Sequence, residues 1–197
     1  GFVDYVLWGD DGKPLALVEA KRTSKSPDSG QHQAKLYADC LEQRYGQRPV
    51  IFYSNGYETY LWDDCNYGPR PVLGFLKKDE LERLVFRRRH RKRLSVTQIN
   101  EDIAGKGRPY QKEAIRRITE TFEEQAMRKS LLVMATGTGK TRTAIALVDL
   151  LKRANWVQRV LFLADRTALL TQAYRAFQSH LPTVTPVDLT RTKAVEG

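Results

Sequence analysis

Residues 130–141 read SLLVMATGTGKT, and this stretch decides the expected fold of the C-terminal half of the chain. The apolar run from Ser130 to Ala135 predicts a buried strand. It leads directly into a loop with two glycines, and the residues that follow, to about Lys152, have the pattern of a helix. A strand, a glycine loop and a helix N-terminus in this order form a cradle for phosphate groups, because backbone N–H groups and the helix dipole both favour an anion.

The residue types in this loop fit a bound ATP. Lys140 would reach the β- and γ-phosphates, and the hydroxyl of Thr141 would coordinate Mg²⁺. The strict pattern has glycine six positions before the lysine, where this chain has Met134, but the loop resembles the version found in helicases. The predicted ATP-binding residues of the loop are Thr136, Gly137, Thr138, Gly139, Lys140 and Thr141.

The segment before this loop, Arg108-Pro109-Tyr110-Gln111, opens a predicted helix that runs to about Met127. It resembles the adenine-reading element of superfamily 2 helicases. An amide offers both a donor and an acceptor, so Gln111 would pair with the adenine edge. Tyr110 is a second candidate for ATP binding, although a packing role explains it equally well.

A second buried strand is predicted at residues 160–166, with the spacing of a parallel α/β unit. Its end resembles the second motif of the same helicase superfamily. By that resemblance, Arg166 and Thr167 would contact the DNA backbone at the N-terminus of a helix that runs to about Ser179.

The N-terminal part of the chain predicts a hairpin. Residues 2–8 and 15–21 read as strands that are buried on both faces, and Asp11-Gly12 favours a two-residue turn. In that register, Gly9 faces Pro14 and Asp4 lies opposite Glu19, with their Cβ atoms about 5 Å apart.

Two facing carboxylates in an apolar sheet repel each other, and a divalent cation removes that penalty. Mg²⁺ prefers such hard oxygen ligands, so the predicted metal ligands of the chain are Asp4 and Glu19 here and Thr141 in the phosphate cradle. Lys21 lies on the same strand face as Glu19 and would hold a phosphate or the attacking water. A simple ion pair between Lys21 and Glu19 at the strand end is the alternative.

Asp4 followed by Glu19-Ala20-Lys21 resembles the core of the PD-(D/E)xK nuclease superfamily. The next predicted helix, residues 29–45, carries Gln33 and Tyr37 on one face. This pair resembles the Q-x-x-x-Y element of helicase-linked nucleases, although an ordinary core stripe also explains it. The candidate catalytic residues are Asp4, Glu19, Lys21, Gln33 and Tyr37, and further strands are expected at residues 49–54 and 57–62.

Residues 79–93 read as a helix that ends in a cluster of cations. Arg87, Arg88 and Arg89 are predicted to contact DNA phosphates, with a solvated helix end as the alternative. The polar, glycine-containing residues 93–108 resemble an interdomain linker.

The composition agrees with a nucleic-acid partner. Lys and Arg number 33 against 23 Asp and Glu, which gives a formal charge of +10 and favours a polyanion or a merely basic surface. Two cysteines without metal-ligand spacing suggest a reducing compartment, hence the cytoplasm, and no apolar run is long enough to span a membrane. The first residue is not Met and the chain opens inside an apolar run, so we expect a fragment.

The order of these parts resembles the restriction (R) subunit of type I restriction-modification enzymes. The expected fold class is α/β: a partial PD-(D/E)xK nuclease domain with a mixed sheet and flanking helices (residues 1–92), a linker (93–108), and part of a RecA-like P-loop motor domain with a parallel sheet (109–197). The resemblance implies ATP and Mg²⁺ as cofactors, double-stranded DNA as substrate, translocation coupled to non-specific cleavage, and methylation (M) and specificity (S) subunits as partners. The alternatives are a stand-alone helicase-nuclease of DNA repair, a non-catalytic DNA-binding scaffold, and a small-molecule kinase.

Overall fold

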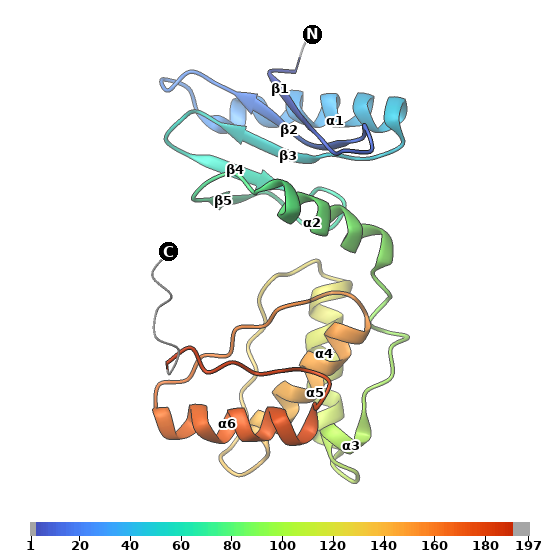
Figure 1. Cartoon of the computed structure of the whole chain (residues 1–197), viewed down its shortest axis with the longest axis vertical. Helices are drawn as coiled ribbons and strands as arrows, with labels where there is room; N and C mark the ends of the chain where they lie inside the picture. The colour runs from blue at the N-terminus through green and yellow to red at the C-terminus, as the bar shows by residue number, and fades with distance from the viewer. Residues whose placement is uncertain (1–2, 191–197) are drawn as a thin grey trace. The chain divides into compact units, whose positions relative to one another are not determined.

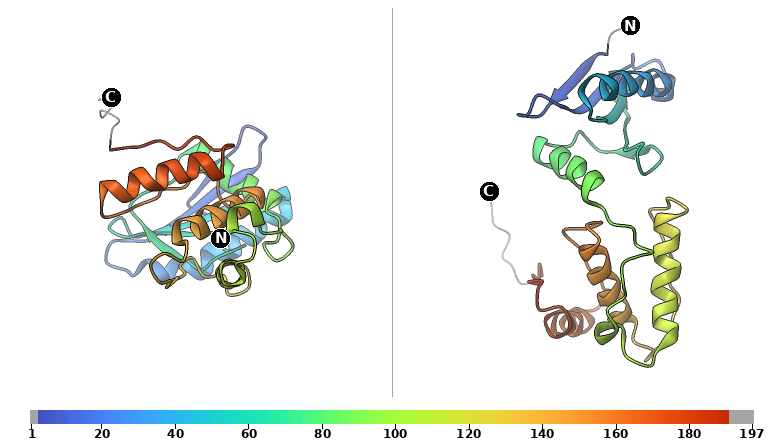
Figure 2. Two further views of the ribbon diagram at one scale, coloured as in Figure 1. Left: turned by 90° about the horizontal axis from the view of Figure 1, so that it is seen from below. Right: turned by 90° about the vertical axis from the view of Figure 1, so that its right-hand side faces the viewer.

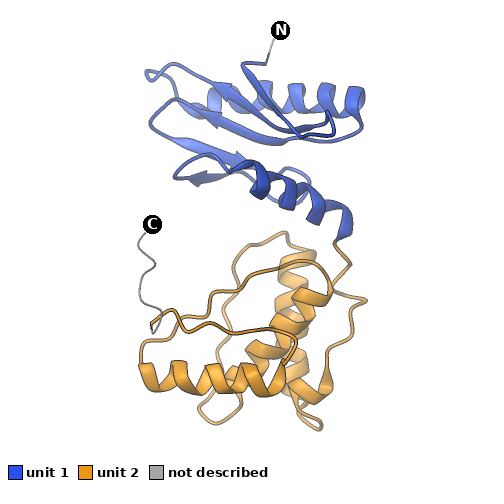
Figure 3. Ribbon diagram, in the orientation of Figure 1, with its two compact units in different colours: residues 1–90 blue, residues 91–197 orange. Residues whose placement is uncertain are grey.

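The structure is a computed structural model that describes residues 3–190. The chain divides between His90 and Arg91 into two compact units, residues 1–90 and residues 91–197 (Figure 3). The assignment of nuclease and motor domains to these ranges stays a prediction.

Unit 1 is built on a mixed five-stranded sheet in the order β1-β2-β3-β4-β5. The β2–β3 pair is parallel and the other three pairs are antiparallel. The strands are β1 (Tyr5–Trp8), β2 (Pro14–Ala20), β3 (Val50–Ser54), β4 (Thr59–Trp62) and β5 (Arg70–Val72), and the helices are η1 (Pro27–Gly30), α1 (Gln31–Tyr45) and α2 (Lys78–His90). The expected mixed sheet with flanking helices is therefore confirmed.

The two central strands are buried because a helix covers each face of the sheet (Figures 1 and 2). Leu17, Ile51 and Tyr53 pack under α1 in one core cluster. Alternate residues, among them Val18 and Phe52, pack under α2 in the other. Strands that are covered on both sides read as nearly continuous apolar runs, which is why the sequence locates β2 and β3 well.

The first strand differs from expectation in two ways. It lies at the edge of the sheet and is largely exposed, so its prediction as a strand buried on both faces is wrong. The predicted two-residue turn is also wrong: Gly12 donates its N–H to Gly9 O at 3.1 Å and has φ 70°, which makes a three-residue loop closed by a left-handed glycine. Trp8 pairs with Pro14, where Gly9 was expected to do so. Because a bulge lies between Leu7 and Trp8, the pairs from Tyr5 to Leu7 nevertheless follow the predicted register.

Unit 2 is helical in its described part. Its helices are α3 (Glu101–Ala104), α4 (Pro109–Glu123), α5 (Lys140–Arg153) and α6 (Thr167–His180). They surround a core that includes Ile115, Ile145, Leu150 and Phe177. In residues 3–190, no helix combines the length and apolarity that crossing a membrane requires.

The parallel sheet expected in this unit is not formed among its described residues. Residues 130–135 and 160–164 have no strand assignment, and they expose apolar side chains such as Leu131 (88%) and Leu163 (79%). A strand is stable only when its backbone groups pair with a neighbour, and no described segment of unit 2 pairs with either run. The two buried strands predicted here are therefore corrected to unpaired, exposed segments.

Residues 93–108, expected to link two domains, instead pack on unit 2. Leu94, Ile103 and Ala104 lie in its core. The carboxylate of Glu123 accepts the N–H groups of Leu94 (2.8 Å) and Ser95 (3.0 Å). Burial opposes the ionisation of Glu123, but these hydrogen bonds and the nearby Arg93 outweigh it and hold its pKa below the ordinary value. This segment is therefore fixed to the end of α4.

Candidate active site

A buried glutamate and a lysine meet where β2 ends. Glu19 is the second-last residue of β2 and is 2% exposed. Its Oε1 accepts a hydrogen bond from Lys21 Nζ at 2.6 Å, while its Oε2 is buried and has no hydrogen-bond partner among the described residues. An unpaired buried carboxylate oxygen is costly, so this atom is suited to a cation.

The lysine continues into a chain of hydrogen bonds. Lys21 Nζ donates to Gln33 Oε1 at 3.0 Å, and Gln33 Nε2 donates to Tyr37 Oη at 2.8 Å. Gln33 and Tyr37 lie one turn apart on α1, so the helix presents both to the end of β2. The structure thus brings four of the five predicted catalytic residues into one connected network.

Asp4, the fifth, lies beside this network on the adjacent chain segment. It directly precedes β1. Since Tyr5 of β1 pairs with Val18 of the antiparallel β2, the next pair of opposite residues along the two strands is Asp4 and Glu19. Its Oδ2 accepts the N–H of Ala20 at 2.8 Å. The carboxylate is therefore held against the residue between Glu19 and Lys21.

The donor set fits Mg²⁺. Asp4 and Glu19 supply carboxylate oxygens, the ligand type that Mg²⁺ prefers, and Glu19 Oε2 has no other described partner. The described residues contain no group of three or more acidic, histidine or cysteine side chains poised to hold a metal. Water and substrate oxygens would therefore complete the coordination, as is usual for Mg²⁺.

Gly30 also belongs to the site, although no pattern in the sequence marks it. A Cβ atom at this position would lie 3.0 Å from Lys21 Cε and 3.1 Å from Glu19 Cγ. A side chain there would press on the ion pair, so glycine lets the start of α1 approach it closely.

Tyr53 pairs with Glu19 on the neighbouring strand, and its burial, with Asp28 and Tyr60 nearby, raises the pKa of Tyr53 to about 12.

The predicted phosphate cradle lies at the start of α5 in unit 2. Gly137 (φ 78°) and Gly139 (φ 88°) both have left-handed backbones, and Gly139 is the N-cap of α5. The first-turn N–H groups of a helix have no partner within it, so those of α5 are available to an anion. Lys140 and Thr141 are the first two residues of α5, and Thr136 and Thr138 complete the loop.

Gln111, expected to pair with adenine, and Tyr110, the second candidate for ATP binding, both contact this loop. Gln111 is 0% exposed, and its Nε2 donates to Thr138 O at 2.7 Å. Tyr110 Oη donates to the same carbonyl at 3.3 Å. A Cβ atom at Gly139 would lie 2.4 Å from Gln111 Nε2, so the amide fits only because this residue is glycine. The Oε1 of Gln111 is buried and has no hydrogen-bond partner among the described residues, and its pairing with adenine stays a prediction.

The basic end of α2 is held by contacts within unit 1. Arg88 is half-buried, with Nε donating to Asp63 Oδ1 at 2.7 Å and Nη1 donating to Arg48 O at 2.6 Å. Arg89 donates to Gln47 Oε1 at 2.7 Å, although it stays exposed, and Arg87 is half-buried on the same helix. Arg88 therefore attaches α2 to the rest of unit 1 through an ion pair that the sequence did not indicate, and its contact with DNA stays a prediction.

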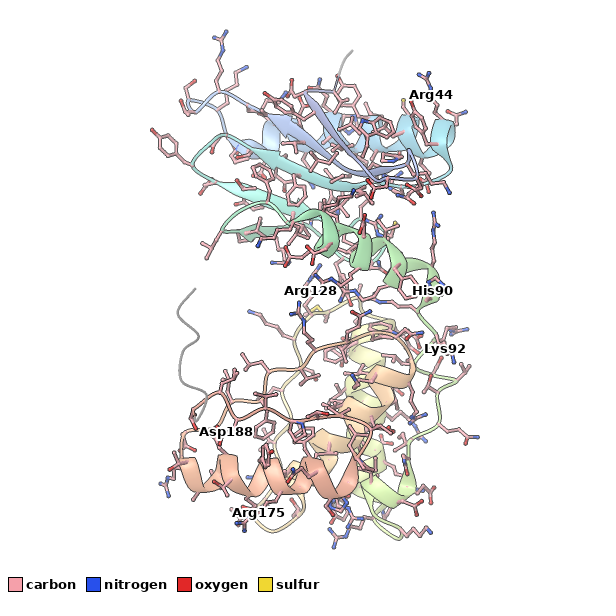
Figure 4. All side chains as sticks on the ribbon, viewed as in Figure 1. Arg44, His90, Lys92, Arg128, Arg175 and Asp188 are labelled. Atoms are coloured by element: carbon pink, nitrogen blue, oxygen red, sulfur yellow. The ribbon has the colours of Figure 1, made fainter. Side chains whose placement is uncertain are left out.

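We expect Arg88→Ala to destabilise the chain by about 3 kcal/mol, because it leaves Asp63 buried without its cation. The free energy of unfolding in urea measures this. The control is Arg44→Ala, which removes an exposed arginine at the C-terminal end of α1 (Figure 4) and should change stability by less than about 0.5 kcal/mol. Unchanged stability together with weakened DNA binding in Arg88→Ala would return this residue to a DNA-contacting role.

Arg166 and Thr167 lie at the N-terminus of α6. Arg166 is the N-cap, Thr167 is the first helical residue, and both are exposed. This placement agrees with the expected position at a helix N-terminus, and their contact with DNA stays a prediction.

Comparison with known proteins divides the chain as its two units do. Residues 2–70 match the family model of the type I restriction enzyme R protein N terminus, and residues 104–194 match that of the type III restriction enzyme res subunit. Both models describe parts of restriction enzymes, so the mixed sheet and the helicase-type region place the chain in the class of restriction-enzyme subunits. Within that class, the chain belongs to the family of type I restriction enzyme R subunits.

Two curated relatives come from Escherichia coli. The EcoAI endonuclease subunit is 31% identical over 86% of this chain and 22% of its own length. The EcoKI endonuclease subunit of strain K12 is 45% identical over 36% of this chain and 6% of its own length. A solved fragment assigned to an HsdR subunit from Vibrio vulnificus YJ016 is 30% identical, covers 79% of this chain and 29% of its own, and gives a TM-score of 0.40. The chain thus spans less than a quarter of the length of these curated relatives.

Proposed function

We propose that the complete protein is the nuclease and motor subunit of a type I restriction enzyme. In this proposal, unit 1 cuts duplex DNA without sequence preference in a Mg²⁺-dependent reaction. Unit 2 contributes to a superfamily 2 motor that converts ATP hydrolysis into movement along DNA. The observation that carries the proposal is the connected network Glu19–Lys21–Gln33–Tyr37, with one buried oxygen of Glu19 unpartnered.

In the nuclease unit, Asp4 and Glu19 would hold the cation. Mg²⁺, when bound, supplies polarisation of the scissile phosphoryl oxygen. Lys21 carries a positive charge at the same strand end and would stabilise the negative charge that develops on the phosphate as water attacks. Gln33 fixes the position of the Lys21 ammonium through its Oε1 and is itself positioned by Tyr37. Water would form the new P–O bond and release a proton to solvent, while the P–O bond to the departing oxygen breaks and that oxygen takes a proton from solvent.

In the motor unit, the loop and Lys140 would bind the phosphates of ATP. Gly137 and Gly139 have left-handed backbones, which glycine adopts readily and which would let N–H groups of the loop face an anion. Lys140 would neutralise charge on the β- and γ-phosphates, and Thr141 would hold the accompanying Mg²⁺. Tyr110 and Gln111 would keep the loop in place through the carbonyl of Thr138.

The experiment that tests this function measures ATP hydrolysis and plasmid cleavage by the full-length protein, with and without its candidate M and S subunits. We expect both activities to require the partners, because in this proposal they deliver the motor to its DNA. Equal activity of the protein alone would overturn the restriction reading and favour a stand-alone helicase-nuclease of DNA repair.

A further inference from the structure

Two loops leave the sheet of unit 1 at the end where the proposed nuclease site lies. Strands β2 and β3 are parallel, and their last residues, Ala20 and Ser54, are paired. Both strands therefore end at the same edge, on the left of this unit in Figure 1. The first loop (residues 21–26) connects β2 to η1, and the second (residues 55–58) connects β3 to β4.

Hydrogen bonds tie these loops to each other. Lys21 donates its N–H to Ser54 O at 2.7 Å, and Asn55 Nδ2 donates to Lys25 O at 3.1 Å. Asn55 is buried, and its Oδ1 accepts the N–H groups of Tyr57 (3.1 Å) and Glu58 (2.9 Å). One amide side chain thus sets the shape of the second loop and holds the first beside it.

The braced loops present two cations and an aromatic ring to solvent. Arg22 and Lys25 are exposed, and neither forms an ion pair with another residue in the part of the chain that the structure describes. Tyr57, at the tip of the second loop, is 84% exposed. Within the two loops, the three positive charges of Lys21, Arg22 and Lys25 stand against the one exposed carboxylate of Glu58, and the neighbouring Asp4 and Glu19 are the carboxylates assigned to the cation.

We propose that Arg22, Lys25 and Tyr57 form a DNA-contact edge that places the scissile phosphate beside Lys21. Arg22 and Lys25 would neutralise phosphates flanking the cleaved bond, a contact that needs no base sequence. The ring of Tyr57 would lie against a sugar or base in the groove, where an exposed aromatic side chain gains contact area. This inference rests on the proposed nuclease function, and it assigns the positioning of duplex DNA to residues outside the catalytic network.

The test uses the full-length protein with its M and S subunits and compares Arg22→Ala/Lys25→Ala, Tyr57→Ala and Tyr57→Phe with wild type. The readout is the rate of DNA cleavage divided by the rate of ATP hydrolysis, measured over a series of KCl concentrations. Both rates depend on DNA binding by the motor, so the division removes that shared dependence. We expect the double variant and Tyr57→Ala each to lower the ratio about tenfold. In a plot of the logarithm of this ratio against the logarithm of the KCl concentration, we expect the slope of the double variant to be smaller in magnitude than that of wild type by about 2. Tyr57→Phe keeps the ring and should behave as wild type.

Arg44→Ala is the matched control, since it removes an exposed arginine at the opposite end of α1 (Figure 4). A photocrosslinking side chain, p-benzoylphenylalanine, replaces Tyr57 in one protein and Arg44 in another, and we expect a crosslink to DNA at position 57 alone. An unchanged cleavage ratio and no crosslink at position 57, with cleavage still abolished by Lys21→Ala, would overturn this inference and leave the proposed function standing. Cleavage that survives Lys21→Ala would instead overturn the nuclease site itself.

Discussion

Lys140→Ala in the full-length protein is expected to lower ATP hydrolysis by at least about 100-fold and to abolish DNA cleavage with it. Lys140 is the first residue of α5 and follows a glycine N-cap with φ 88°. Lys140 is the one cation among residues 136–141, so its loss removes the charge that would neutralise the β- and γ-phosphates. Cleavage is lost too, because in the proposed mechanism it follows ATP-driven movement.

The measurements are phosphate release and plasmid cleavage in the presence of the M and S subunits. The control is Arg175→Ala, an exposed arginine on α6 in the same unit (Figure 4), which should keep both activities. If Lys140→Ala hydrolyses ATP at the wild-type rate, residues 136–141 do not form the nucleotide site. If it cuts DNA without hydrolysing ATP, the coupling of the two units is wrong.

Lys21→Ala is expected to lower DNA cleavage by at least about 100-fold while ATP hydrolysis continues at the wild-type rate. Lys21 Nζ lies 2.6 Å from Glu19 Oε1 and 3.0 Å from Gln33 Oε1, so one ammonium group joins the carboxylate to the helix α1. Its removal takes away the charge that would stabilise the attacked phosphate. Unit 2 contains the nucleotide loop and is not altered by the change.

Plasmid nicking and phosphate release, followed in parallel, measure this separation of activities. Lys35→Ala is a suitable control, because it removes an exposed lysine from α1 without touching the network. Loss of both activities in Lys21→Ala would mean that the residue supports the fold of the whole protein. Retained cleavage would mean that the hydrolytic site lies elsewhere.

The sequence predicted the elements that are buried on both sides or strongly periodic. The apolar runs of β2 and β3 and the helical pattern of α1 and α5 were located to within a few residues. Apolarity alone did not distinguish an edge strand from a central one, so β1 was expected to be buried. The strands expected at residues 130–135 and 160–166 depend on partners that no local pattern contains, and the described part of unit 2 supplies none.

The sequence predicted the residues of the candidate site but not the hydrogen bonds that connect them. The spacing of Glu19, Lys21, Gln33 and Tyr37 indicated which residues to consider, while their connection through Lys21 Nζ and Gln33 Oε1 became visible only in the fold. The ion pair of Arg88 was not predicted, because a count of cations does not reveal that Asp63, distant in sequence, lies buried beside one of them. Long-range pairing of this kind is set by tertiary packing.

The substitution Glu19→Gln tests the central claim most directly, with cleavage and ATP hydrolysis measured in the same reaction on full-length protein with its M and S subunits. Glutamine has nearly the shape of glutamate but removes the charge from the buried oxygen that lacks a partner. We expect ATP hydrolysis to continue at the wild-type rate while the DNA stays intact. Cleavage at the wild-type rate would contradict this expectation.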